Sequence, residues 1–409
     1  MAQRISEIAV AARLEDYFEN RIGKLLKDRR KRESFAMYSF GILGDGERKS
    51  VEPIAARACG DPRQTNNLHS KLLYFLGESV WDDRGVRLEA ARYAIDVVQQ
   101  REPVTTWIID DTGFLKQGNH SVGVQRQYTG SAGKITNCQI GVSLAVATDS
   151  EQIPVDFELY LPESWTEDRV RRREAHIPEQ MEFKTKIELA MEMMGRARAA
   201  GIPGDVLLAD AAYGNSGEFR AAVRQMGFDY AVGVQPQTLV RRVDAIGRDH
   251  GTALTCGEMI EKVGRGVFRN LTWREGTKYK LSGCFYFARV KSLNDNEINF
   301  PDRESLWLIV EWPSGEAKPT HYLLSTLPKR MSKKQIVRIL KGRWRTERMY
   351  EDLKGELGLD HFEGRSFPGW HHHVSVVLCC YAFVVAERSR SFPPSAIRAY
   401  ANRALSIAA

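Results

Sequence analysis

The chain has 409 residues, of which 43% are hydrophobic and 27% are charged, which is typical of an ordinary soluble globular protein with two or three domains. The 59 basic residues outnumber the 52 acidic ones, and this modestly favours a polyanionic partner. The six cysteines lack metal-binding spacing, and the N-terminus lacks a signal-peptide pattern. The longest apolar run (374–386) is too short to span a bilayer. We therefore expect a cytoplasmic protein with no membrane partner.

Residues 1–102 show helical periodicity, and we expect them to form an N-terminal helical DNA-binding domain. Its most basic stretch is 24–32, which includes Arg29, Arg30, Lys31 and Arg32. A run of this kind can be the solvated face of a helix or a surface that contacts DNA phosphates. The sequence leaves both interpretations open.

Two short apolar segments each lead into aspartate. Residues 107–109 form a predicted strand that ends at Asp110 and Asp111, and residues 206–209 precede Asp210. Such segments are typical of strands buried at the centre of an α/β sheet, and ligands bind at the carboxyl ends of these strands. Because successive side chains alternate faces, only one of Asp110 and Asp111 can join a given site. The alternative for either strand-end aspartate is a role as a helix N-cap.

The segment 103–235 predicts a mixed sheet. Three strand-like stretches are followed by a helix, a strand, a helix and a strand, an order that resembles the RNase H-like α/β fold, with helices flanking the sheet. We expect 103–235 to be the first part of a catalytic core, 236–326 a β-rich insertion, 327–365 the second part of the core, and 366–409 a C-terminal helical segment.

The segment 333–354 predicts one helix that carries a third carboxylate. Arg343, Glu347 and Lys354 lie close to one face of it. A surface Arg–Glu salt bridge is the common explanation for this spacing. However, a glutamate on a helix and two strand-end aspartates supply oxygen ligands from three elements, which suits two hard divalent cations such as Mg²⁺, with Mn²⁺ as a substitute. Such ions activate the attacking oxygen and stabilise the leaving oxygen in phosphoryl transfer.

These residues resemble a family, the DDE transposases of bacterial insertion sequences, in the branch with a Tyr-Arg-Glu-Lys signature. The signature reads Y-x2-R-x3-E-x6-K, and Arg343, Glu347 and Lys354 match it in register, whereas Leu340 replaces the tyrosine. The resemblance covers roughly residues 100–365 and includes a β-strand insertion between the second aspartate and the glutamate.

The resemblance also selects among the aspartates and implies their roles. The Asp-Thr pattern favours Asp111 over Asp110, and the D-x-x-Y pattern selects Asp210. The catalytic and metal-binding residues are then Asp111, Asp210 and Glu347, which would hold two Mg²⁺ ions.

The rest of the signature implies contacts with DNA. Arg343 and Lys354 would bind phosphates of the transposon end, and Lys341 would replace the hydrogen bond lost at Leu340. Trp344 could stack on an unpaired base, but core packing is the interpretation that we favour for it.

We therefore expect a nucleoid-associated bacterial DNA transposase that binds terminal inverted repeats, cuts them with metal ions and joins them to target DNA, as a homodimer on double-stranded DNA. Three alternatives stay open: an RNase H-like endonuclease without strand transfer, a DNA-binding relative that no longer uses its catalytic core, and a glycosidase with paired carboxylates. The glycosidase would not explain the basic helix or the isoelectric point near 9.0.

Two further clusters are expected to lie on the surface. His371, His372 and His373 are adjacent and cannot all face one ion, so surface exposure or phosphate contact is the expectation. The arginine-rich stretch 169–173 is expected to be a solvated helix edge, with phosphate contact as the alternative.

Overall fold

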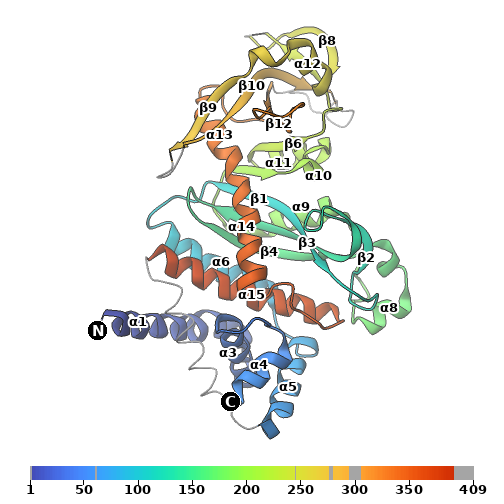
Figure 1. Ribbon diagram of the computed structural model, residues 1–409. Coiled ribbons are helices and arrows are strands. Elements are labelled where there is room, and N and C mark those ends of the chain that lie inside the picture. The colour runs from blue at the N-terminus through green and yellow to red at the C-terminus, as the bar shows by residue number, and fades with distance from the viewer. Residues whose placement is uncertain (1, 60–61, 245, 276–279, 294–304, 391–409) are drawn as a thin grey trace. The chain divides into compact units, whose positions relative to one another are not determined.

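The structure is a computed structural model that describes residues 2–59, 62–244, 246–275, 280–293 and 305–390. The chain divides into two compact units. Unit 1 comprises Met1–Val104, Asp111–Pro203 and Arg345–Ala409, and unit 2 comprises Thr105–Asp110 and Gly204–Trp344. One strand, β1 (Thr106–Leu115), contributes residues to both units (Figure 1).

Unit 1 is mainly helical and contains three complete strands. Its helices are α1 (Ala2–Asp16), α2 (Gly23–Leu26), α3 (Arg29–Leu43), α4 (Val51–Ala58), α5 (Pro62–Gly77), α6 (Asp83–Val98), α7 (Glu163–Thr166), α8 (Arg169–Glu174), α9 (Lys186–Ala199), α14 (Arg345–Glu351) and α15 (Phe367–Ser389), with a π-helical turn at Tyr17–Ile22. Its strands β2 (Gln125–Thr129), β3 (Lys134–Ala147) and β4 (Gln152–Tyr160) form an antiparallel meander.

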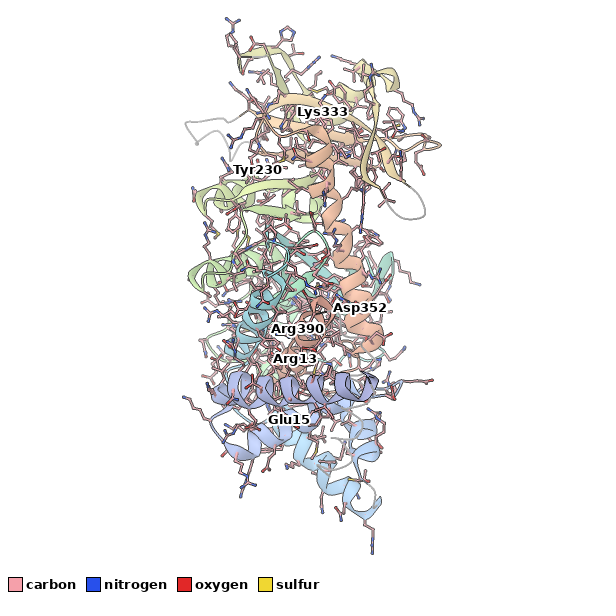
Figure 2. All side chains as sticks on the ribbon, turned by 90° about the vertical axis from the view of Figure 1, so that its left-hand side faces the viewer. Arg13, Glu15, Tyr230, Lys333, Asp352 and Arg390 are labelled. Carbon is pink, nitrogen blue, oxygen red and sulfur yellow. The ribbon has the colours of Figure 1, made fainter. Side chains whose placement is uncertain are left out.

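The C-terminal helix α15 is the core helix of unit 1. It is long and apolar enough to cross a membrane, but nearly all of its residues are buried inside the protein, as in the core helix of a soluble protein. It packs against α3, α5, α6 and β4, so the N-terminal and C-terminal helices share one hydrophobic core. At its end, buried Glu387 accepts hydrogen bonds of 2.8 Å from both Arg13 and Arg390. Arg13 and Arg390 are labelled in Figure 2.

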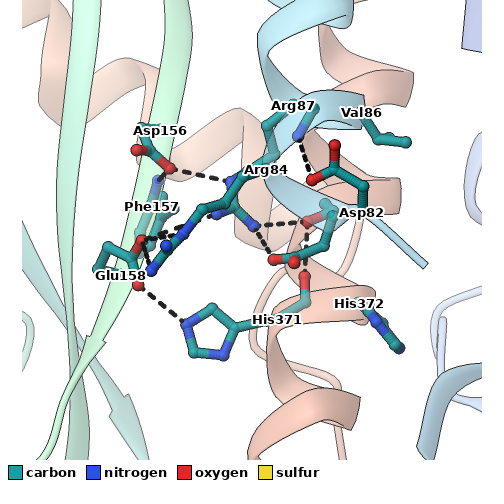
Figure 3. Close-up of polar contacts among 12 residues, drawn as sticks. Asp82, Arg84, Val86, Arg87, Asp156, Phe157, Glu158, His371 and His372 are labelled. Carbon is teal, nitrogen blue, oxygen red and sulfur yellow. Dashed lines mark hydrogen bonds and ion pairs between the residues drawn. The ribbon is translucent and has the colours of Figure 1, made fainter. Parts of the chain in front are cut away.

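A buried network of charged residues joins four elements of unit 1 (Figure 3). The fully buried Arg87 of α6 lies 3.0 Å from Asp156 of β4, and Arg196 of α9 contacts Asp156 at 2.6 Å and Glu158 at 2.8 Å. His371 of α15 lies 3.3 Å from Glu158. Burial alone would lower the pKa of Arg87, but the surrounding carboxylates raise it above its ordinary value. Arg87 is therefore charged, and its pairing compensates the cost of burial.

The expectation that the three adjacent histidines lie on the surface is wrong. His371, His372 and His373 are all buried on α15. The His372 ring stacks on Trp81 at a centroid distance of 4.1 Å, and His373 contacts Tyr38 at 2.9 Å. Tertiary packing reverses the expectation because an α-helix enclosed on all sides buries consecutive residues, whatever their polarity, if each finds a hydrogen-bond partner.

Unit 2 contains most of the sheet. Its strands β5 (Val206–Ala209), β6 (Asp229–Val234), β7 (Leu239–Val243), β8 (Asp249–Thr255), β9 (Arg269–Glu275), β10 (Lys280–Ser292), β11 (Leu306–Glu311) and β12 (His321–Ser325) join the first part of β1 in the order β1-β5-β6-β12-β11-β10-β7-β8, with β9 on β10. The helices are α10 (Ala211–Gly214), α11 (Gly217–Gln225), α12 (Cys256–Val263) and α13 (Lys333–Lys341), with a 3-10 turn at Arg265–Val267.

The predicted fold class is confirmed. The strands form a 12-stranded mixed sheet flanked by helices, in which β1, β5 and β6 are parallel and the strands from 239 to 325 are antiparallel. The β-rich character of 236–326 is present, although the sequence did not indicate β7, β8 or α12. The finer domain boundaries given above stay predictions, and residues 391–409 of the predicted C-terminal segment lie outside the described residues.

Candidate active site

Two aspartates occupy adjacent positions on neighbouring strands of unit 2. β1 and β5 pair in parallel, and the last pair of this register joins Ile109 with Ala209. Asp110 and Asp210 are the next residues of the two strands. The two predicted aspartate segments therefore come together at the carboxyl ends of their paired stretch, where open α/β sheets place ligands.

Asp210 also begins a helix. Its Oδ1 accepts a 2.9 Å hydrogen bond from the Ala212 amide, so Asp210 is the N-cap of α10. After Asp210 the chain passes very close to β6. A Cβ at Gly214 would lie only 2.0 Å from the Gly233 carbonyl oxygen. Only glycine permits this approach at position 214. The N-cap interpretation of Asp210 is therefore confirmed, and its metal-binding role stays a prediction.

The prediction that the first strand ends at Asp111 is wrong. Only the pairing with β5 ends there, at Ile109, whereas β1 continues to Leu115. Just beyond the strand, the Lys116 amide donates a 3.1 Å hydrogen bond to the Asn137 carbonyl of β3 in unit 1. The aspartates thus lie inside a long strand, at the point where its partner β5 stops.

Asp110 and Asp111 contact different cations. In unit 2, Nη1 of Arg343 lies 3.2 Å from Oδ2 of Asp110. In unit 1, Nζ of Lys186 lies 2.9 Å from Oδ2 of Asp111. The separate partners agree with the alternation of side chains along a strand. Lys186 was not among the predicted site residues. Its one local signal is its place in the first turn of a helix, where the helix dipole disfavours positive charge.

Lys354, the last residue of the signature, lies beside the residues of β1 that follow the aspartates. Its ammonium group donates to Thr112 Oγ1 and to the Gly113 carbonyl, both at 2.8 Å, and to Ser131 Oγ at 3.4 Å. Burial lowers the pKa of Lys354. The contacts with Thr112 and Gly113 bring the end of the signature to the strand that carries Asp111, within unit 1.

The predicted continuous helix over 333–354 is wrong in detail. The segment consists of α13 (Lys333–Lys341), a 3-10 turn (Gly342–Trp344), α14 (Arg345–Glu351) and a π-helical turn (Asp352–Glu356). The change begins at Gly342, since glycine has a low helix propensity and short 3-10 stretches are common where a helix changes course.

Glu347 lies on the exposed side of α14. Two contacts on the other side fix this helix to the sheet of unit 1. Thr346 Oγ1 accepts a 2.9 Å hydrogen bond from Gln152, and the Tyr350 and Ser143 hydroxyls lie 2.5 Å apart. Because both contacts involve buried groups, they hold α14 in a defined rotation and leave Glu347 accessible.

The other signature residues differ in exposure. Leu340 is buried, as expected of an apolar side chain in the tyrosine position, and Lys341 contacts both carboxylate oxygens of Glu311, at 2.6 and 2.7 Å. Trp344 has 60% of its surface exposed, so core packing, the interpretation favoured for it, is wrong. An exposed indole is available for stacking.

The basic run lies at the start of α3 in unit 1. Asp28 caps this helix by accepting hydrogen bonds from the Arg30 and Lys31 amides. The Arg29 side chain is 86% exposed and pairs with Glu33 at 2.8 Å, and Lys31 donates to the Val80 carbonyl at 2.6 Å. Two members of the run thus make local contacts at the protein surface, and both original interpretations are compatible with this placement.

The donor set of the three selected carboxylates fits a hard divalent cation. Asp111, Asp210 and Glu347 supply the oxygen ligands that Mg²⁺ prefers. Asp111 already pairs with the Lys186 cation, which shows that its carboxylate lies in an environment able to place positive charge against it. Among residues that the structure describes, no three His, Cys, Asp or Glu side chains group closely enough to hold a metal ion. The metal-binding roles therefore stay predictions.

Comparison with known proteins identifies two matching family models. One, described as a DDE superfamily endonuclease, matches residues 21–280, and another, described as a transposase DDE domain, matches residues 184–383. A protein of Microchaete diplosiphon, described as a probable transposase for insertion sequence element IS701, is 28% identical over 371 residues, which cover 90% of this chain and 86% of the relative. The two models overlap across the segment that holds Asp210, and the second extends over Glu347.

Proposed function

Because the chain belongs to the DDE family of insertion-sequence transposases, whose partner is DNA, we propose that it binds the terminal inverted repeats of its element and catalyses metal-dependent cleavage and strand transfer. The family match covers more than half of the chain and supports a nuclease-type enzyme. Beyond the family assignment, the proposal adds the inverted repeats as the substrate, the dependence on a metal ion and the strand-transfer step.

One observation carries the proposal. The two basic residues of the signature each contact β1, on either side of Asp111 in the sequence: Arg343 contacts Asp110, and Lys354 contacts Thr112. If Arg343 and Lys354 formed only surface salt bridges, we would not expect them to contact β1 on both sides of Asp111. The contacts support a common role for Asp111 and the signature that contains Glu347.

The carboxylates Asp111, Asp210 and Glu347 would hold two Mg²⁺ ions, which activate the attacking water or 3′-hydroxyl and stabilise the leaving oxygen of the cut phosphodiester. The protein supplies the positions of these carboxylates. Asp210 is fixed by its N-cap hydrogen bond, and Glu347 by the two contacts that anchor α14. Fixed ligands of this kind lower the reorganisation that catalysis requires.

The basic residues would bind the DNA backbone. Arg343 and Lys354 place cations next to the aspartate strand, where a phosphate adjoining the cleaved bond would lie, and the run 29–32 adds charge at the start of α3. Exposed Trp344 would stack on a base displaced near the cleavage site. Because an element has two ends, we propose a homodimer in the DNA complex.

The test is cleavage of a labelled duplex that carries the native end of the element, with a supercoiled plasmid as the target for strand transfer. Wild type is compared with Glu347→Gln, in Mg²⁺ and in EDTA. We expect metal-dependent cutting at the end and joined products with wild type, and a loss of at least about 10³-fold in cutting with Glu347→Gln while DNA binding persists.

The matched control is Glu351→Gln, since Glu351 is an exposed glutamate on the same helix. It should cut like wild type. Cutting without joined products would favour a nuclease without strand transfer, and binding without cutting would favour a DNA-binding relative that no longer uses its catalytic core. Normal cutting by Glu347→Gln would refute the role of this residue.

A further inference from the structure

Helix α5 of unit 1 presents one broad polar face to solvent. The exposed residues recur with the spacing of a single helix face, and they are Arg63, Asn66, Asn67, Ser70, Lys71 and Tyr74, with Gln64 beside them. On the opposite side, Leu68, Leu72 and Phe75 are buried where α5 packs against α3, α4 and α15. The apolar face therefore fixes α5 in unit 1, and the polar face is accessible from solvent.

The composition of this polar face differs from that of other exposed helices in unit 1. Helix α6 exposes both Arg92 and Asp96, and α9 exposes both Glu192 and Arg198. Charges of both signs are typical of a solvated helix face. The sequence of α5, in contrast, contains no aspartate or glutamate. Its face combines neutral amide side chains, which both donate and accept hydrogen bonds, with positive charge, and this combination suits a polyanion that presents hydrogen-bonding groups.

The helix before α5 completes a helix-turn-helix unit. Helix α4 packs against α5, and only the three residues 59–61 separate the two helices in the sequence (Figure 1). In DNA-binding units of this kind, the second helix enters the major groove and its N-terminal residues contact base edges. Gln64 and Asn67 lie in the first two turns of α5, which is where such contacts are made.

The basic run at the start of α3 lies beside α5. Arg29 pairs with Glu33 at 2.8 Å, and Lys71 of α5 lies 3.7 Å from the same carboxylate. The rings of Phe35 and Phe75 pack edge to face between the two helices, with their centres 6.4 Å apart. Positive charge from α3 thus borders the polar face of α5. This pattern complements a DNA duplex, in which phosphates flank the groove that displays the base edges.

From these observations, and on the premise of the proposed function, we infer that α5 reads the base sequence of the element's ends, with Gln64 and Asn67 as its specificity-determining residues. Their side-chain amides form hydrogen bonds with base edges in the major groove, where adenine presents the edge that best matches an amide. Lys71 and the run 29–32 bind the flanking phosphates and supply affinity that does not depend on sequence. Specificity and general affinity are thus assigned to different residues of unit 1.

The test is equilibrium binding of the full chain, measured by fluorescence anisotropy in EDTA so that no cutting occurs. One duplex carries the native end of the element, and the other has the same base composition in shuffled order. We expect Gln64→Ala and Asn67→Ala each to bind the native end about 10-fold more weakly than wild type and the shuffled duplex equally well. Both side chains are exposed, so both variants should keep the circular dichroism spectrum of wild type.

Two further variants serve as controls. Arg30→Gln removes an exposed cation of the basic run, and it should weaken binding to both duplexes equally and reduce the dependence of binding on salt. Gln100→Ala removes an exposed glutamine of unit 1 that lies outside α5, and it should bind both duplexes like wild type.

The role of α5 and the proposed function can fail separately. If wild type prefers the native end and both α5 variants keep that preference, the role of α5 is overturned. Equal weakening on both duplexes would make Gln64 and Asn67 backbone contacts, and a changed oligomeric state with unchanged preference would make α5 a surface for a second copy; either result overturns base reading. A wild type without any preference would refute the proposed binding to the element's ends, and the inference with it.

Discussion

The ammonium group of Lys354 donates a 2.8 Å hydrogen bond to the hydroxyl of Thr112, a residue 242 positions earlier in the chain. It also bonds the neighbouring Gly113 carbonyl. A lysine that the signature assigns to phosphate binding thus also fixes the strand next to Asp111. It connects two segments of unit 1 that lie far apart in the sequence.

Lys354→Met should therefore affect both stability and catalysis. The change leaves the Gly113 carbonyl without this donor, and we expect the free energy of unfolding to fall by about 1–2 kcal/mol. Urea unfolding measures this loss of stability. At 25 °C, the rate of cleavage of the element's end should fall by more than the decrease in the folded fraction explains. The exposed Arg348→Met on α14 is the control and should change stability by less than about 0.5 kcal/mol.

Asp210 allows its two roles to be separated by substitution. Asparagine caps helices about as well as aspartate, so Asp210→Asn should keep the wild-type melting temperature while metal-dependent cleavage is lost. Asp210→Ala should lose cleavage and also about 1 kcal/mol of stability, because the cap of α10 disappears. Parallel thermal melts and cleavage assays check both outcomes. Normal cleavage by Asp210→Asn would show that the residue is only a cap.

Trp344→Ala tests whether the exposed indole contacts DNA. Because the side chain is 60% exposed, its removal should change the free energy of unfolding by less than about 0.5 kcal/mol. If it stacks on a base, affinity for the cleaved end should fall by about 1–3 kcal/mol, which fluorescence anisotropy can measure. Equal affinities of variant and wild type for intact and cleaved ends would contradict the stacking role.

The buried His373 should make the protein sensitive to acid. Burial lowers its pKa to about 4, and its contacts with the Tyr38 hydroxyl and the Gly358 carbonyl suit a neutral ring. The pKa in the unfolded chain is about 6.5, so the unfolded state binds more protons between these values. The stability that His373 contributes is complete above pH 6.5 and is lost as the pH falls toward 4.

His373→Gln should remove this dependence. Between pH 7 and pH 5, wild type should lose about 2 kcal/mol more unfolding free energy than the variant, because glutamine does not titrate. Urea unfolding at both pH values measures the difference. His372, whose pKa burial also lowers to about 4, is present in both proteins and cancels in the comparison. Parallel pH profiles for the two proteins would contradict the buried neutral state of His373.

Features encoded by neighbouring residues could be predicted from the sequence. The apolar segments 107–109 and 206–209 predicted two neighbouring strands of the sheet, β1 and β5. The position of Glu347 in the signature could be read from residue spacing alone. Such patterns succeed because strand and helix periodicity depend on residues close together in the chain.

Where local signals were weak, the predictions failed. Strand β2 lies in the polar stretch before residue 131, and the antiparallel pair β7 and β8 lies in a segment rich in charge, so none of the three has a clear apolar strand pattern. The 3-10 turn at Gly342–Trp344 interrupts a segment whose hydrophobic spacing suits one helix. Pairing with distant residues decides the strands β2, β7 and β8, whereas the 3-10 turn begins at a glycine, which has a low helix propensity.

Residue patterns along the chain identified the family and the order of the core elements, and they selected three carboxylates whose catalytic roles stay predictions. The contacts of the residues near these carboxylates followed only from the folded structure: Lys186 with Asp111, Arg343 with Asp110 and Lys354 with Thr112, as did the burial of His371. These contacts join residues tens to hundreds of positions apart. They depend on how the helices pack against the sheet, and residue spacing along the chain carries no information about a partner that only folding brings near.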